Sequence, residues 1–258
     1  MLIGLFTLLF ILLGGEHHSF LLNPEMKKDV GIYISDKDRK KEIDSLIKDI
    51  EKKEEHFQKD VKKGYEKKLD GLNMEIGSTR PQFTSEYQNF YVDLGKLQGE
   101  YISMELKARS LIKPDEWEKI MSKVLQAPDK EKVRKKLLEE TKKMSDKLLK
   151  DCEKHIPDQA GKNKAKAIID DYEKKGEELD NAYLDLSYQH LNAIRPYKVS
   201  RADFEPIRDR MLKVRQNFTE NAVNMRFDLL TLVPAKEWKG FAKDLNDEFN
   251  NLGAGISK

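Results

Sequence analysis

The sequence predicts an all-α protein, and three observations support this fold class. Apolar side chains recur at steps of three and four residues along most of the chain, which is the period of one helix face. Glycine and proline are few, at 14 and 8 of 258 residues. No segment shows the alternation of apolar and polar residues that is typical of half-buried strands. Together these observations favour a bundle of long helices.

The composition of the chain narrows the classes of protein to which it can belong. Charged residues make up 36% of the chain and hydrophobic residues 38%, and the mean hydropathy is −0.73. This mixture suits amphipathic helices with solvated faces and a shared core. The 48 basic and 46 acidic residues leave a net charge of +2, so we expect no nucleic-acid partner. The single cysteine, Cys152, excludes an intrachain disulfide and a four-thiolate zinc site.

The N-terminal segment differs from the rest, because "MLIGLFTLLFILLGG" carries no charge. A secretory signal would place basic residues before the apolar run, and an interfacial helix would have a polar face. Met1–Leu13 alone would cover only about 20 Å, whereas extension through Phe20, Leu21 and Leu22 gives a spanning length. We therefore predict a hydrophobic membrane anchor over residues 1–22, in contact with lipid. A segment that is cleaved as a signal is the alternative.

Three polar residues, Glu16, His17 and His18, follow this apolar run and would lie at the membrane edge. Neighbouring histidines point in different directions on a helix, so this cluster is a poor metal chelator. We expect it in the headgroup layer, and ion or proton coupling would follow only if it were drawn inside a membrane complex.

The expected helices can be placed from capping residues and breaks. "SDKD" at Ser35–Asp38 reads as a capping sequence that opens a long helix, which "GSTRP" at Gly77–Pro81 then breaks. Pro114 suits the first position of a short helix. The other helices are expected at about 84–112, 129–154, 162–194, 201–231 and 235–251.

Two segments of the chain resemble each other. "MELKARSLIKPDEWEKI", Met104–Ile120, aligns without a gap with "MRFDLLTLVPAKEWKGF", Met225–Phe241. Two further pairs lie upstream, "IKDIEKKEEHF" with "IDDYEKKGEEL" and one "RP" with another, and the three blocks occur in the same order in both halves. We interpret this as internal duplication. The predicted units are an anchor (1–22), a first three-helix unit (34–127), a connecting helix (128–156), a second three-helix unit (157–251) and a tail (252–258).

The repeat contains both tryptophans of the chain, Trp117 and Trp238. Each follows a corner between a long helix and a short one, where a large flat ring can fill the gap. We expect these two residues, with Met104 and Met225, to be core anchors of the repeat rather than ligand platforms.

Catalytic and metal motifs are missing from the sequence. The Glu-x-x-His pairs of di-iron bundles, the phosphate-binding Gly-x4-Gly-Lys-Ser/Thr motif and the nucleophile elbow Gly-x-Ser-x-Gly do not occur. Cys152 and His155 lie one helical turn apart, but a structural zinc needs two more ligands. We therefore expect no catalytic site, metal or cofactor.

The unit of a long helix, a turn with proline and an acid, and a short helix with an aromatic residue resembles the Spy/CpxP group of periplasmic helical chaperones. The segments that match are "LIKPDEW" and "LTLVPAKEW". The glutamine of that group's Leu-Thr-x-x-Gln signature is missing from both. The resemblance implies a cradle-shaped helical protein that holds unfolded clients or senses envelope stress.

The sequence as a whole favours a non-enzymatic accessory or scaffolding subunit of a membrane protein complex, whose partners are other protein subunits. The alternative is an envelope chaperone of the Spy/CpxP kind with a cleaved N-terminal segment. We expect a single-pass protein of the inner membrane with a periplasmic body. Lys27, Lys28 and the lysines of 37–41 would instead favour a cytoplasmic body.

Overall fold

The computed structural model describes residues 20–22, 24–124 and 129–254, and every regular element in these ranges is helical. The all-α prediction is therefore confirmed for this part of the chain. The elements are η1 (Phe20–Leu22), α2 (Pro24–Tyr33), α3 (Lys37–His56), the π-helical η2 (Phe57–Lys62), α4 (Lys63–Met74), α5 (Arg80–Ser110), α6 (Pro114–Val124), α7 (Lys130–His155), α8 (Gln159–Ile194), α9 (Arg201–Leu230) and α10 (Trp238–Ala254).

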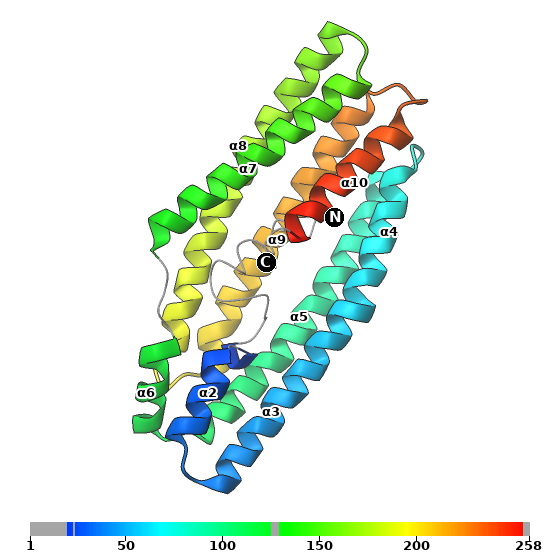
Figure 1. Cartoon of the computed structure of the whole chain (residues 1–258). Helices are drawn as coiled ribbons and strands as arrows, with labels where there is room; N and C mark the ends of the chain where they lie inside the picture. Colours follow the sequence, from blue (N-terminus) through cyan, green and yellow to red (C-terminus); the bar gives the residue numbers. More distant parts are fainter. Residues whose placement is uncertain (1–19, 23, 125–128, 255–258) are drawn as a thin grey trace.

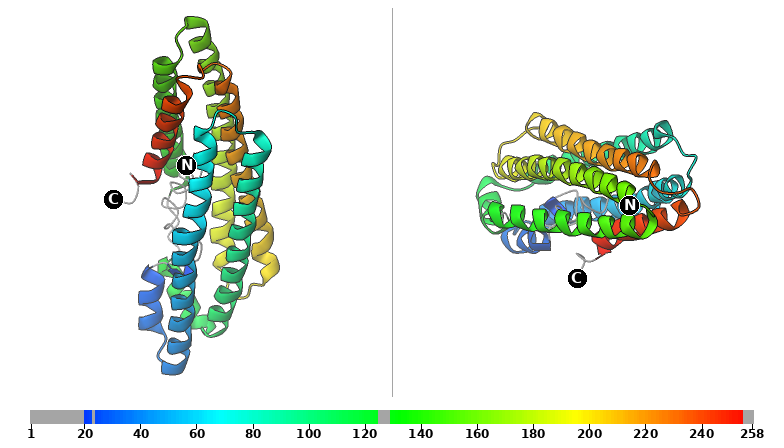
Figure 2. Two further views of the ribbon diagram at one scale, coloured as in Figure 1. Left: turned by 90° about the vertical axis from the view of Figure 1, so that its right-hand side faces the viewer. Right: turned by 90° about the horizontal axis from the view of Figure 1, so that it is seen from above.

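The long helices form an elongated bundle whose elements run along its length (Figure 1). α5 packs against α3 and α4 on one side and against α9 on the other, and α9 packs against α8. The short helices cover the ends, with α2 on α6 at one end and α10 between α7 and α4 at the other. Figure 2 shows the same bundle from the side and from above.

The central pair, α5 and α9, is antiparallel. The Tyr91 hydroxyl of α5 lies 2.9 Å from the Thr219 hydroxyl of α9 and donates to the Arg215 carbonyl at 3.1 Å. Arg80, at the start of α5, contacts Asn224 near the end of α9. These contacts fix the register of the two helices, which join the halves of the molecule.

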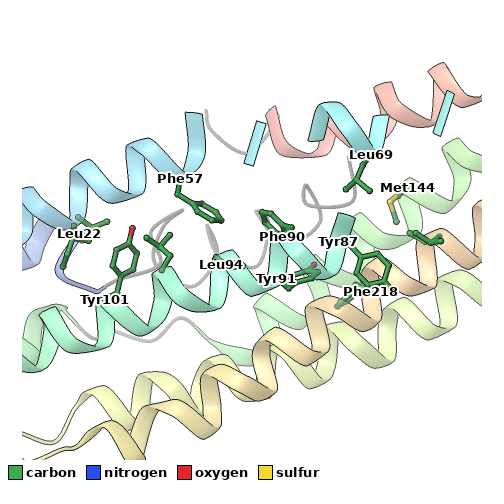
Figure 3. Close-up of a cluster of buried hydrophobic side chains, with 14 of the residues drawn as sticks. Leu22, Phe57, Leu69, Tyr87, Phe90, Tyr91, Leu94, Tyr101, Met144 and Phe218 are labelled. Carbon is green, nitrogen blue, oxygen red and sulfur yellow. The ribbon is translucent and has the colours of Figure 1, made fainter. Parts of the chain in front are cut away.

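A continuous apolar core runs through the bundle and includes an aromatic cluster around α5 (Figure 3). Phe90 lies 5.8 Å from Phe57, 5.7 Å from Tyr65 and 5.2 Å from Tyr91, measured between ring centres. Each such aromatic contact stabilises the fold by about 0.5–1.5 kcal/mol, in addition to the stabilisation from burial of its apolar surface. The π-helical turn η2 begins at Phe57, so the ring lies at the point where the helical repeat is locally widened.

Several helix boundaries differ from those expected, and capping side chains explain the differences. Asp36, rather than Ser35, caps α3, because its carboxylate accepts from the backbone N–H groups of Asp38 and Arg39. α5 begins at Arg80, four residues earlier than expected, since Thr79 and Gln82 form a capping box. At α10 the residues after Pro234 form turns, so the helix begins at Trp238 rather than 235.

The N-terminal part of the described chain also differs from the expectation. Leu21 and Leu22 belong to a short 3-10 turn packed on α2 and α3, and they are 0% and 4% exposed. The expected anchor therefore does not continue as one helix through these residues. α2, which was not expected, buries Met26 and Val30 completely. Within the described ranges, no helix has both the length and the apolar character needed to cross a membrane.

Candidate functional site

The two tryptophans are buried at the corners where the sequence placed them. Trp117 lies in the first turn of α6, and Trp238 is the first residue of α10. Their exposed fractions are 2% and 1%. Neither ring face is open to solvent, so these side chains are positioned to bind parts of the protein itself.

Each indole N–H caps the end of a helix from the opposite half of the chain. Trp117 Nε1 donates to the carbonyl oxygen of Arg195, just beyond α8, at 2.9 Å. Trp238 Nε1 donates to the carbonyl oxygen of Asn73, in the last turn of α4, at 3.1 Å. The last carbonyls of a helix have no partner within it, so each donor satisfies a group that burial would otherwise leave unpaired. The donors are 121 residues apart and the acceptors 122.

An arginine stacks on the Trp117 ring and binds the same helix end. The Arg109 guanidinium lies 4.1 Å from the ring centre. It donates to the carbonyl oxygen of Ile194 at 3.0 Å and also to that of Pro196. A cation on the face of an indole and beside a helix C-terminus is stabilised by both the ring quadrupole and the helix dipole. Burial lowers the pKa of Arg109 to about 10, which leaves it charged at neutral pH.

A second arginine makes the matching contacts at Trp238. The Arg226 guanidinium lies 4.9 Å from that ring centre and donates to the carbonyl oxygens of Leu72, at 3.2 Å, and Glu75, at 2.9 Å. Burial lowers its pKa to about 10 as well. The two arginines do not occupy aligned positions in the sequence repeat, because Arg226 directly follows Met225 whereas Arg109 lies five residues after Met104. Different positions on the two long helices therefore deliver the same group to the same place.

The two methionines of the sequence repeat support these corners unequally. Met225 is 3% exposed and belongs to the core, whereas Met104 is half-buried and packs on the core from its edge. The structure therefore places all four repeat residues in or against the core, as expected from their helical spacing.

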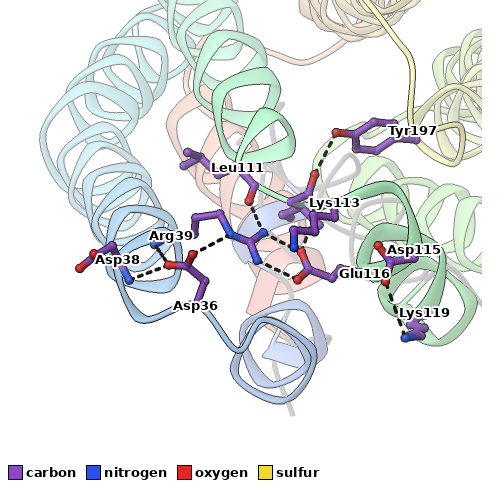
Figure 4. A network of polar contacts seen from close by, with 10 residues as sticks. Asp36, Asp38, Arg39, Leu111, Lys113, Asp115, Glu116, Lys119 and Tyr197 are labelled. Atoms are coloured by element: carbon purple, nitrogen blue, oxygen red, sulfur yellow. Dashed lines mark hydrogen bonds and ion pairs between the residues drawn. The ribbon is translucent and has the colours of Figure 1, made fainter.

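The acidic residue before each tryptophan faces a basic side chain from another helix. Glu116 and Arg39 form a two-pronged ion pair, with nitrogen–oxygen distances of 2.7 and 2.9 Å (Figure 4). Arg39 also donates to the Leu111 carbonyl at 2.8 Å, and Glu116 accepts from the Lys113 backbone at 2.8 Å. The hydrogen bond from Arg39 lowers the pKa of Glu116 to about 2. The pair joins α3 to the corner between α5 and α6.

At the second corner, His155 lies beside the acidic residue before the tryptophan, as Arg39 does at the first. Its Nδ1 lies 3.5 Å from Glu237, and its Nε2 lies 2.9 Å from Asp244. Lys154 also bonds to Asp244 at 2.6 Å, and this contact is the largest reason that the pKa of Asp244 is lowered. The cluster ties the C-terminus of α7 to α10.

Cys152 lies on the same helix as His155, one turn before it. The thiol is buried, at 2% exposure, and burial raises its pKa to about 12. Among the described residues, no group of three or more histidine, cysteine, aspartate or glutamate side chains is placed to hold a metal ion. Glu16, His17 and His18 lie outside the described residues.

These corners therefore use their charges to hold helices together. The sequence indicated the tryptophans and methionines, because a repeated segment draws attention to them. It did not indicate Arg39, Arg109 or Arg226, because nothing in a run of charged residues separates a buried arginine from a solvated one.

Comparison with known proteins adds no relative to this description. No protein-family model matches the chain, and neither a curated protein nor a solved structure matches it. The fold and the corners define an all-α protein with two similarly built tryptophan corners.

Proposed function

We propose that the chain is a non-enzymatic, membrane-anchored scaffolding or accessory subunit, whose helical body binds other protein subunits of a membrane complex. The observation that carries the proposal is the way in which the N-terminal side enters the body. Leu21, Met26 and Val30, which follow the uncharged run of residues 1–15, are 0% exposed. An anchor attached in this way would hold the body close to the membrane without a free linker.

The construction of the bundle is consistent with a scaffold. Two corners of the same design, each closed by a tryptophan from one half and a helix end from the other, lock the halves together. We propose that this arrangement descends from the internal duplication suggested by the sequence. Cross-connected halves give an elongated body that keeps its shape while its solvated helix faces remain available to partners.

The outer faces carry many charged pairs between neighbouring helices, such as Lys53 with Glu100 and Lys130 with Asp185, at 2.6 and 2.7 Å. Exposed pairs of this kind contribute only about 0–1 kcal/mol each. These charges keep the surface hydrated, and each weak pair can be replaced by a pair with a charged group of a partner. Ile32, Ile76 and Val92 are exposed apolar side chains that such a partner could cover.

Native mass spectrometry of protein extracted from membranes in mild detergent tests the proposal. The matched control is the same chain without residues 1–19. We expect the full chain in the membrane fraction, with its N-terminal segment intact and with partner subunits in fixed proportion, and the control in the soluble fraction. A shortened, unaccompanied protein in the soluble fraction would contradict the proposal and favour the envelope-chaperone alternative.

The side of the membrane needs a separate measurement. We propose a periplasmic body in the inner membrane. Protease added to spheroplasts should then degrade the body while cytoplasmic marker proteins stay intact. Full protection until the membrane is permeabilised would place the body on the cytoplasmic side.

A further inference from the structure

The seam between α7 and α8 contains a buried carboxyl group. Asp180 of α8 is 2% exposed. Its Oδ2 accepts a hydrogen bond from the Thr141 hydroxyl of α7 at 2.9 Å, whereas its Oδ1 has no hydrogen-bond partner. One turn further along α7, the hydroxyl of Ser145 is also buried without a hydrogen-bond partner. Buried polar atoms without partners are rare in folded proteins and call for an explanation.

The two helices come close together at this point. A Cβ atom added to Gly176, one turn before Asp180, would lie 3.7 Å from the Thr141 methyl group. On either side, the seam is apolar, with Val133, Leu137, Met144 and Leu148 all buried along α7. The carboxyl group therefore sits within a tight and mostly apolar contact.

Among the residues that the structure describes, no positively charged side chain bonds to Asp180. α7 presents Thr141 and Ser145, which do not titrate. On α8 itself, Glu177 adds a like charge, and Tyr172 is a buried phenol whose pKa is raised by its burial and, to a smaller extent, by Asp180. α9 directs Arg215 toward α8, but its guanidinium donates to the Tyr183 hydroxyl at 2.6 Å. The ionised form of Asp180 would thus be desolvated, with the Thr141 hydrogen bond as partial compensation.

Desolvation by burial raises the pKa of Asp180 to about 7, despite the opposing hydrogen bond from Thr141. A carboxyl group in the open seam would ionise near its ordinary value of 3.8. The closed seam therefore binds the proton more tightly than the open seam. Closure is most favoured below about pH 3.8, weakens as the pH rises from 3.8 to about 7, and levels off above that value.

α7 is attached in a way that allows its middle to respond. It packs against α8 along its length and against α10 near its C-terminus. Polar contacts fasten its two ends, through Lys130 with Asp185 at the start and His155 with Asp244 at the end. Between these points, two polar contacts cross the seam: Arg134 donates to Asn181 at 2.9 Å, and Thr141 donates to Asp180 at 2.9 Å.

We propose that Asp180 is a pH-responsive latch, which seats α7 on α8 when protonated and loosens the seam when it ionises. Loosening exposes the apolar stripe of α7 around Met144 and Leu148. The device would make this stripe available to a binding partner above neutral pH and withdraw it below. The inference concerns the seam alone and does not depend on membrane anchoring.

Hydrogen exchange measured by mass spectrometry tests the latch on the full chain. The protection of peptides from the middle of α7 is divided by that of α5 peptides from the same sample, which removes the intrinsic pH dependence of exchange. We expect the relative opening of α7 to increase about tenfold between about pH 6 and about pH 8.5, from the two pKa values and linkage.

The decisive variant is Asp180→Asn, which keeps the shape of the group and cannot ionise. Its α7 opening should be independent of pH, and at pH 8.5 it should be no greater than that of the wild type at about pH 6. Asp171→Asn, at an exposed position of the same helix, is the matched control and should retain the wild-type response. A pH-independent wild type, or an equal response in Asp180→Asn, would overturn the proposal. The wild-type measurement stands even if the variant is unstable.

Discussion

Trp238 donates its indole N–H to the carbonyl oxygen of Asn73, which is 165 residues earlier in the chain, at 3.1 Å. Trp117 makes the corresponding bond to Arg195, which is 78 residues later, at 2.9 Å. Each tryptophan therefore belongs by sequence to one half of the molecule and closes a helix of the other. Because each corner joins a tryptophan of one half to a helix end of the other, the stability of each half depends on the other.

This relationship predicts similar effects of substitution at the two corners. Trp238→Phe and Trp117→Phe retain an aromatic ring but remove the N–H donor, which leaves a buried carbonyl without that bond. We expect each to lower the free energy of unfolding by about 1–3 kcal/mol. Urea denaturation followed by circular dichroism measures the change.

The double variant gives the stricter test. The corners are at different ends of the bundle, so two independent losses should add within about 0.5 kcal/mol if unfolding is one cooperative transition. Two separate transitions after either single substitution would show that the halves unfold independently, which would contradict the coupling of the halves through their corners.

The Arg39–Glu116 pair predicts a specific acid sensitivity. Because the pKa of Glu116 is lowered to about 2, its contribution to stability is present above its ordinary value of 4.5 and is lost as the pH falls from 4.5 toward 2. Glu116→Gln should lower the melting temperature at neutral pH and flatten the acid limb in this window. Glu118→Gln, at an exposed position two residues later, serves as the control and should follow the wild type. An unchanged acid limb in Glu116→Gln would contradict the prediction.

His190 predicts an acid sensitivity at higher pH. Desolvation lowers its pKa to about 4, so the folded protein resists the proton that the unfolded chain takes up near 6.5. The contribution of His190 to stability is therefore greatest above pH 6.5 and declines as the pH falls toward 4, by at most about 2 kcal/mol between pH 7 and 5.

Replacement of this histidine should remove the decline. In His190→Leu, which cannot titrate, the unfolding free energy at pH 7 minus that at pH 5 should be lower than in the wild type by up to about 2 kcal/mol. His56→Gln is the control, because that imidazole is exposed and pairs with Asp60 on the protein surface. An unchanged pH dependence of the unfolding free energy in His190→Leu would show that another group causes the decline.

Cys152 predicts slow thiol chemistry in the native state. Its thiol is 2% exposed, and burial raises its pKa to about 12, so the reactive thiolate is scarce. Labelling by a maleimide at neutral pH should be at least about a hundredfold slower than in the urea-unfolded chain. Fast labelling of the folded protein would show that the C-terminal part of α7 is open in solution.

Much of the fold could be predicted from local signals. The end of α8 at Ile194, the start of α9 at Arg201 and the start of α6 at Pro114 agree with the expected positions, because breaks and capping residues act over a few residues. The start of α5 was missed because Pro81, read as a breaker, lies in the first turn, where proline is tolerated. α2 was missed because its burial comes from contacts with distant helices.

The sequence by itself determined that this is an all-α protein, since helical periodicity, caps and breaks are properties of neighbouring residues. It also singled out the tryptophans, through a repeated segment. Only the tertiary structure decided that Trp238 caps Asn73, that Arg226 rather than its neighbours stacks on that ring, and that Asp180 is buried against Thr141. These contacts join residues far apart in the chain, so their partners depend on how the helices pack, and a charged residue looks the same in sequence whether packing buries it or leaves it in water.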